Sequence, residues 1–244
     1  DLKIEEGSFF SLLGRNGAGK STTIGMLTGT LRPTEGEAFL LGRTLDPDDP
    51  WFKSRVGVVS EEPPLFSRLT AQEQLVFAGR MFGLSPKEAT RRAQVSLELL
   101  KLSKASKALI CDFSRGMKKK LAIGCALIHA PRLLFLDEPF EGVDATSAAT
   151  IREVLKGLAA SGATILLTTH ILEVAQRLCD SVAILHHGKL AYESTMKELL
   201  ARGESLEEVF SRVSGARGDA KEAMPDWLVA PHDHETETKA PPSS

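Results

Sequence analysis

The sequence lacks the features of a membrane-spanning, disulfide-bonded or nucleic-acid-binding protein. Its three cysteines (Cys111, Cys125 and Cys179) occur singly, without the paired spacing of a zinc site. No apolar run approaches the ~18 residues of a transmembrane helix, and no signal-peptide pattern is present. The formal net charge of −2 provides no overall basic field for a polyanion. The scattered cysteines suit a reducing compartment, and the remaining composition, 42% hydrophobic and 25% charged residues, is typical of a globular protein.

A glycine-rich stretch at residues 14–22 has the pattern of a phosphate-binding loop, G-x-x-x-x-G-K-[ST]. Glycines let backbone N–H groups wrap closely around phosphates, Lys20 can reach the β- and γ-phosphates, and the Ser21 hydroxyl can ligate Mg²⁺. A predicted strand (8–13) precedes the loop and a predicted helix (21–28) follows it, which argues against a chance glycine turn. The residues expected to bind nucleotide here are Gly14, Arg15, Asn16, Gly17, Ala18, Gly19, Lys20, Ser21 and Thr22.

The rest of the chain predicts an α/β fold, a P-loop NTPase with a mainly parallel sheet flanked by helices. Apolar runs that predict strands lie at 37–41, 56–59, 133–137, 163–169, 181–185 and 190–192. Helical patterns at about 114–129, after 144 and at 171–178 alternate with them. Capping boxes predict helix starts at Thr70, Ser85, Thr195 and Ser205.

We divide the chain into an ATP-binding domain (1–213), with a helical subdomain inserted at about 66–130, and a disordered tail (214–244). Because Asp1 lies so close to the first strand, we expect a truncated N-terminus. Two smaller interpretations concern cations and ligands. Lys118 to Lys120 are expected to form a solvated face, and His232, Asp233 and His234 give only a weak metal pattern in the tail. Apolar stripes expected to pack in a core comprise Leu75, Val76, Gly79 and Phe82, then Val95, Leu97, Leu99 and Leu100.

A second constellation follows the apolar run 133–136, where two carboxylates end a predicted strand. Asp137, at the carboxyl end of a parallel strand next to the phosphate loop, is placed to hold Mg²⁺. Glu138 can orient or deprotonate the water that attacks the γ-phosphate. Two solvated acids at a strand end would explain this pair if the phosphate loop were absent.

The order of further motifs resembles ABC ATPases over residues 7 to about 213. Residues 113–121 (Phe-Ser-Arg-Gly-Met-Lys-Lys-Lys-Leu) resemble the LSGGQ signature in its looser S-x-G-M form, which is common in exporter-type members. Residues 141–144 look like the D-loop, residues 168–170 look like the switch histidine after a strand, and residues 56–63 look like the Q-loop.

The resemblance implies a head-to-tail dimer with two ATP molecules between the subunits. Ser114 and Gly116 would cap the ATP that lies on the partner's phosphate loop, and Asp144 would couple the two sites across the interface. His170 would contact the γ-phosphate, and Glu61 would be a further nucleotide and Mg²⁺ contact. The implied metal ligands are therefore Ser21, Asp137 and Glu61, and the implied catalytic residues are Glu138, His170 and Lys20.

The sequence departs from the family pattern in three places. Glu61 stands where the family usually has Gln, and Arg115 replaces the first signature glycine. The aromatic residue that stacks on adenine in this family lies upstream of the phosphate loop and is missing, and neither Trp51 nor Tyr192 is suitably placed to replace it.

Taken together, the motifs predict the ATP-binding, ATP-hydrolysing subunit of an ABC transporter, an exporter, acting with ATP and Mg²⁺. Its expected partners are a second ATP-binding subunit, identical or paralogous, and a separate polytopic permease that holds it at the inner face of the cell membrane. No nucleic acid partner is expected. Two alternatives remain: a soluble ABC ATPase acting on ribosomes or DNA, and a binding-only subunit, suggested by Glu61 and Arg115. The cargo is not encoded in these motifs.

Overall fold

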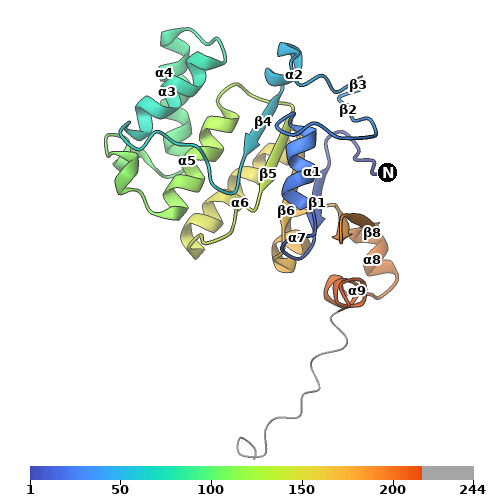
Figure 1. Cartoon of the computed structure of the whole chain (residues 1–244). Helices are drawn as coiled ribbons and strands as arrows, with labels where there is room; N and C mark the ends of the chain where they lie inside the picture. Colours follow the sequence, from blue (N-terminus) through green and yellow to red (C-terminus); the bar gives the residue numbers. More distant parts are fainter. Residues whose placement is uncertain (216–244) are drawn as a thin grey trace, which may run out of the picture.

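The computed structural model describes residues 1–215 and shows a six-stranded sheet with helices on both faces (Figure 1). The strands are β1 (Phe9–Leu13), β4 (Val56–Val59), β5 (Leu133–Asp137), β6 (Thr164–Thr169), β7 (Ser181–His186) and β8 (Lys189–Thr195). Their order in the sheet is β4-β5-β6-β1-β7-β8, and all neighbours are parallel except β7 and β8. The predicted fold class is confirmed.

The helices are α1 (Lys20–Leu27), α2 (Pro50–Lys53), α3 (Ala71–Met81), α4 (Pro86–Leu99), α5 (Arg115–Leu127), α6 (Ala145–Ala160), α7 (Leu172–Leu178), α8 (Met196–Ala201) and α9 (Leu206–Val213). Two short 3₁₀ turns, Ser103–Ala105 and Ile110–Asp112, connect α4 to α5. Each helix that the sequence predicted is present within two residues of its expected start.

Successive apolar side chains of the central strands pack into cores on opposite faces of the sheet, which explains why helices cover both faces. In β5, Leu134 and Leu136 pack into the core that α5, α6 and α7 share, whereas Leu133 and Phe135 pack into the core under α1 and α2. The same division separates neighbouring residues of β1 and β6. Since successive strand side chains point to opposite faces, fully apolar strands must bury both.

The helical segment α3 to α5 lies beyond the β4 edge, at the upper left of Figure 1. The Thr70 capping box is complete, whereas the Ser85 one is half formed. The Ser85 hydroxyl accepts from the Glu88 N–H, but the Glu88 carboxylate pairs with Arg91 and Arg92 instead of reaching back to the Ser85 N–H. Those ion pairs hold the Glu88 pKa at about 2. The boundaries of a helical subdomain at 66–130 stay a prediction.

Several sequence interpretations are corrected by packing. Phe82, Val95 and Leu99 are exposed and do not join the core, although Leu75, Gly79, Leu97 and Leu100 do. The run 37–41 forms only the two-residue strand β2 (Phe39–Leu40), which pairs with an unpredicted β3 (Arg43–Thr44) in a separate hairpin. Most of the predicted tail (214–244), including His232, Asp233 and His234, lies outside the described residues.

Candidate functional site

The carboxyl ends of the parallel strands meet at one edge of the sheet, and the predicted phosphate loop lies there between β1 and α1. Gly19 ends the loop with φ +105°, a left-handed conformation that favours glycine. Gly14 begins it so close to β7 that a Cβ would lie 2.8 Å from the Leu185 carbonyl oxygen. These two glycines let the loop turn tightly into the N-terminus of α1, where unpaired N–H groups favour an anion.

Lys20 is the first residue of α1, and its side chain is directed back into the loop. It is 6% exposed, and its Nζ donates to the Gly14 carbonyl at 2.9 Å and to the Arg15 carbonyl at 3.4 Å. The same ammonium lies 3.2 Å from Oε1 of Glu138. The loop lysine and the strand-end glutamate, 118 positions apart in the sequence, therefore form a buried ion pair.

Glu138 is 5% exposed and lies between the two basic groups of the site. Its Oε1 faces Lys20, and its Oε2 lies 3.2 Å from Nδ1 of His170. Neither carboxylate oxygen accepts a hydrogen bond within residues 1–215. The residue has φ +45°, and its N–H is shared between the Thr168 carbonyl and hydroxyl. A buried carboxylate with unfilled acceptor positions is suited to binding a water or a donor.

Asp137, the last residue of β5, is hydrogen-bonded to the neighbouring strand β6. The sequence placed its strand next to the phosphate loop, but β6 lies between β1 and β5. Thr168 of β6 donates its hydroxyl to Asp137 Oδ1, which leaves the second oxygen for another ligand. The buried Asp137 thus has one oxygen oriented by the intervening strand.

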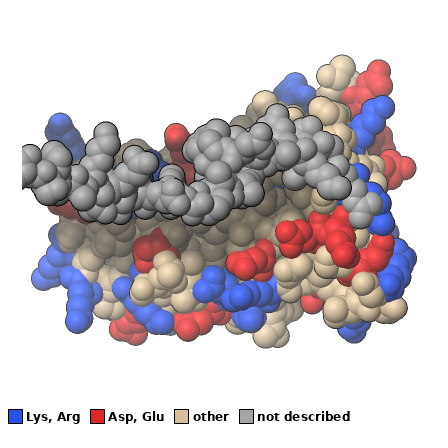
Figure 2. Space-filling view, turned by 90° about the horizontal axis from the view of Figure 1, so that it is seen from below, with Lys and Arg blue, Asp and Glu red and all other residues tan. Residues whose placement is uncertain are grey.

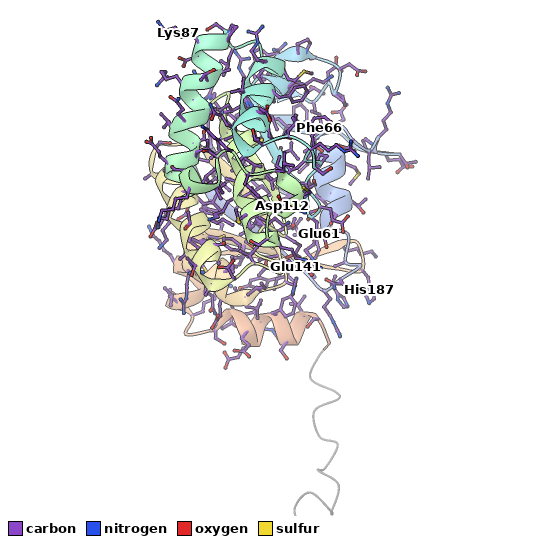
Figure 3. The ribbon with its side chains drawn as sticks, turned by 90° about the vertical axis from the view of Figure 1, so that its left-hand side faces the viewer. Glu61, Phe66, Lys87, Asp112, Glu141 and His187 are labelled. Carbon is purple, nitrogen blue, oxygen red and sulfur yellow. The ribbon has the colours of Figure 1, made fainter. Side chains whose placement is uncertain are left out.

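A cavity of about 250 Å³ lies in front of these groups. Its lining consists of Asn16, Gly17, Gly19, Lys20, Ser21, Thr22, Glu61, Glu138 and Glu141. Glu141 was not predicted as a site residue. Its N–H donates to the Glu138 carbonyl at 3.2 Å, so a tight turn after β5 brings it back to the site. Glu61 and Glu141, both labelled in Figure 3, line the cavity from separate segments of the chain. The sequence signal that could have predicted it is its position three residues after the Asp-Glu pair at the end of the strand.

The oxygen groups around this cavity suit Mg²⁺, which prefers hard oxygen ligands and retains several waters. Ser21 and Glu61 line the cavity, whereas Asp137 is absent from its described lining and accepts a hydrogen bond from Thr168. The unsatisfied oxygens of Glu138 confirm that the acidic side of the cavity has acceptor capacity to spare. Oxygen donors of the kind that Mg²⁺ prefers therefore line the cavity, and the ligand set of Ser21, Asp137 and Glu61 stays a prediction.

The second group of predicted residues lies apart from this cavity, whose lining among the described residues includes none of Ser114, Gly116 and Asp144. Ser114 caps α5 by accepting from the Met117 N–H, and Asp144 caps α6 by accepting from the Ser147 N–H. The hydrogen bonds from Ser147 lower the Asp144 pKa. Gly116 lies between the two caps, where a Cβ would be 2.6 Å from Asp144 Oδ2 and 2.6 Å from Ser147 Oγ.

The lysine run 118–120 is not the solvated face that the sequence indicated. Lys119 is 6% exposed and Lys120 is 7% exposed. Burial lowers the pKa of both, although the carboxylates of Glu61, Asp137, Glu141 and Glu138 oppose the shift at Lys119. The Lys119 ammonium donates to main-chain carbonyls beside the cavity, so a cation of α5 lies behind the acidic groups.

Comparison with known proteins places this geometry in context. The family model described as "ABC transporter" matches residues 1–141. The chain is 39% identical over 201 residues to the linearmycin resistance ATP-binding protein LnrL of Bacillus subtilis (strain 168), covering 82% of this chain and 65% of that protein. It is 38% identical over 229 residues to the Nod factor export ATP-binding protein I of Cupriavidus metallidurans, covering 94% of this chain and 74% of that protein.

A solved structure shares the fold and shows a relative with hydrolysis products. It is a dimeric ATP-binding cassette in a post-hydrolysis state bound to ADP and Pi. The two folds superpose with a TM-score of 0.74 at 27% sequence identity, covering 80% of this chain and 88% of the other.

Proposed function

Since this chain belongs to the ABC transporter family of ATP-binding proteins, we propose that it binds and hydrolyses ATP to power transport, and specifically export. The observation that carries the proposal is the buried ion pair of Lys20 and Glu138 at the phosphate loop, with the exposed His170 in contact with the second carboxylate oxygen of Glu138. It combines a phosphate-binding cation with a carboxylate and an imidazole at a strand end.

The residues divide the work of hydrolysis between binding and water activation. Backbone N–H groups of the loop and Lys20 would bind the phosphates, while Ser21, Asp137 and Glu61 would hold Mg²⁺, which neutralises charge on the phosphates. Glu138 would orient and deprotonate the attacking water, with His170 on its other oxygen. Because Lys20 pairs with Glu138 in this structure, phosphates that draw Lys20 away would free the carboxylate for the water.

The separated signature residues support a dimer. Ser114, Gly116 and Asp144 do not line the phosphate-loop cavity of their own chain. A second subunit, packed head to tail, would bring these groups to the exposed side of the nucleotide. The dimeric cassette with ADP and Pi supports this arrangement, and either an identical or a paralogous subunit fits it.

An apolar groove supports a membrane partner. It has a volume of about 800 Å³, and its lining includes Val58, Pro63, Met81, Phe82 and His129. Val58, Met81 and Phe82 are exposed, which is unusual for a contiguous patch unless another protein covers it. Within residues 1–215, no helix combines the length and apolar character needed to cross a bilayer. A polytopic permease docked in this groove would hold the chain at the inner face of the cell membrane.

The alternative is a soluble ABC ATPase that acts on ribosomes or DNA. Figure 2 shows acidic and basic side chains intermingled over the visible lower face, which does not favour a polyanionic partner there. The binding-only alternative is disfavoured because Glu138 contacts both Lys20 and His170, and Asp137 directly precedes it.

The first test measures ATP hydrolysis together with ATP-dependent dimer formation. In Glu138→Gln the carboxylate that activates water is lost while the loop stays intact, so MgATP turnover should fall about 10³-fold and an ATP-bound dimer should accumulate. Phosphate release and light scattering measure the two effects. Wild-type protein that binds MgATP without turnover would favour the binding-only alternative, and a monomer at saturating MgATP would contradict the symmetric dimer.

The partner is tested by purifying the protein from detergent-solubilised membranes of its source. A stoichiometric polytopic protein is the expected companion. Recovery with ribosomes or DNA, and with nothing polytopic, would reverse the ranking of the two functions.

A further inference from the structure

Lys119 on α5 carries an ammonium group that is buried beside the site. Its side chain is directed inward, and Nζ donates to the carbonyls of Glu61 at 2.5 Å and Glu138 at 3.1 Å, with Ser60 at 3.5 Å. Lysine is seldom buried unless its charge is paired. Here the ammonium is held by main-chain oxygens at the ends of two strands, β4 and β5.

We propose that Lys119 is a positioning residue for ATP hydrolysis, which holds the main chain of Glu61 and Glu138 so that both carboxylates face the cavity. The inference rests on the proposed function. It assigns Lys119 no contact with the nucleotide, because Lys119 is absent from the described lining of the phosphate-loop cavity.

The backbone of Glu138 shows why such a contact is needed. Its φ of +45° is unfavourable for a residue with a Cβ and persists only where the surroundings hold it. The N–H of Glu138 is held by Thr168 of β6, and its carbonyl is held by Lys119 of α5. The two contacts fix the peptide groups on both sides of the Cα, and hence the direction of the carboxylate.

The same ammonium joins the two segments that follow the paired strands β4 and β5. The segment after β4 carries Glu61, and the segment after β5 carries Glu138. Beyond the last paired residues of the two strands, Val59 and Leu136, Lys119 contacts both segments through their main-chain carbonyls. Its positive charge also offsets the acids gathered there, so one side chain provides both geometry and charge balance.

Lys120 provides a matched control. It is the next residue on α5, and it is buried to the same degree. The carboxylate of Asp144 opposes the fall in its pKa that burial causes. It donates no hydrogen bond within residues 1–215 to Glu61 or Glu138. Replacing Lys120 therefore removes a buried charge from the same helix turn without removing the carbonyl contacts.

The experiment compares Lys119→Met, Lys119→Arg and Lys120→Met in the purified protein. Methionine keeps the length and removes the donors, so Lys119→Met should lower kcat about 100-fold with KM for MgATP changed less than about threefold. Lys119→Arg, which keeps charge and donors, should recover at least tenfold of that loss. Lys120→Met should stay within about threefold of wild type.

Amide hydrogen exchange provides a readout that does not depend on turnover. Peptides covering residues 60–62 and 137–141 should exchange faster in Lys119→Met than in Lys120→Met. Equal kcat losses for the two methionine variants, or unchanged exchange in Lys119→Met, would overturn the assignment. A wild-type protein without turnover would refute the proposed function instead, and the exchange data would still decide whether Lys119 holds these segments.

Discussion

The phosphate-loop half and the signature half of the predicted site are built in opposite ways. Lys20 and Glu138 are buried and interact with each other across the sheet edge. Ser114 and Asp144 are exposed helix caps whose hydrogen bonds are satisfied by the next turn of their own helices. The first half is assembled by the fold of one chain, whereas the second is preformed on a surface and has no nucleotide groups of its own chain to meet.

The largest expected effect comes from separating the two halves onto different chains. Lys20→Met removes the phosphate-binding cation, and Ser114→Arg blocks the signature surface, so each variant alone should lose about 10³-fold in turnover. A mixed dimer of the two variants contains one site with both changes and one site with neither. Mixing them should therefore restore measurable turnover, which phosphate release detects.

The control is the double variant Lys20→Met/Ser114→Arg mixed with wild type. In that mixed dimer every site carries one change, so it should stay inactive. Failure of the single variants to complement, when cross-linking shows that mixed dimers form, would break the comparison by showing that each site is completed within one chain.

A smaller effect is expected from Gly116→Ala, because the signature half is also a packing surface. The new Cβ would lie 2.6 Å from Asp144 Oδ2 and from Ser147 Oγ, so α5 and α6 must move apart. Overpacking of this kind costs about 1–3 kcal/mol of unfolding free energy. Thermal melting measures the loss, and Gly157→Ala, on open space in α6, is the matched control. Equal melting temperatures for both variants would contradict the packing role.

The smallest effect concerns His129, which lies outside both halves at the end of α5. Burial lowers its pKa, although a hydrogen bond with the Val56 carbonyl opposes the shift. The folded state then favours the neutral ring. Stability is therefore fully present above the unfolded pKa of about 6.5 and is lost as pH falls toward the folded value.

Urea unfolding between pH 7.5 and 5 measures this dependence, and His129→Asn should flatten it. His187, an exposed residue in the turn before β8, gives the control variant His187→Asn, which should keep the wild-type slope. An unchanged slope in His129→Asn would assign the pH dependence of stability to other groups.

Local patterns predicted most of the fold because they are complete within a few residues. The apolar run that forms β5 and the capping boxes at Thr70, Thr195 and Ser205 needed no distant partner. The hairpin of β2 and β3 was missed because two-residue strands carry too little periodicity.

The site was predictable where a motif names the residue and unpredictable where burial decides. Lys20 and Glu138 were named as candidates from local motifs and their predicted context, but their mutual contact depends on strand order, including the β6 that separates β1 from β5. Three consecutive lysines suggest a solvated face. The burial of Lys119 became visible only when the strand ends of β4 and β5 supplied carbonyls for it.

Helix α5 connects the apolar groove to the Ser114 cap. Its 13 residues extend about 20 Å, with Ser114 at one end and groove-lining residues such as Ala126 near the other. A rigid rod of this length that tilts by about 5° moves its far tip by about 2 Å. A partner that presses on the groove would therefore displace the Ser114 cap at the other end of the helix. A shift of that size is enough to change a reaction rate about 10²-fold.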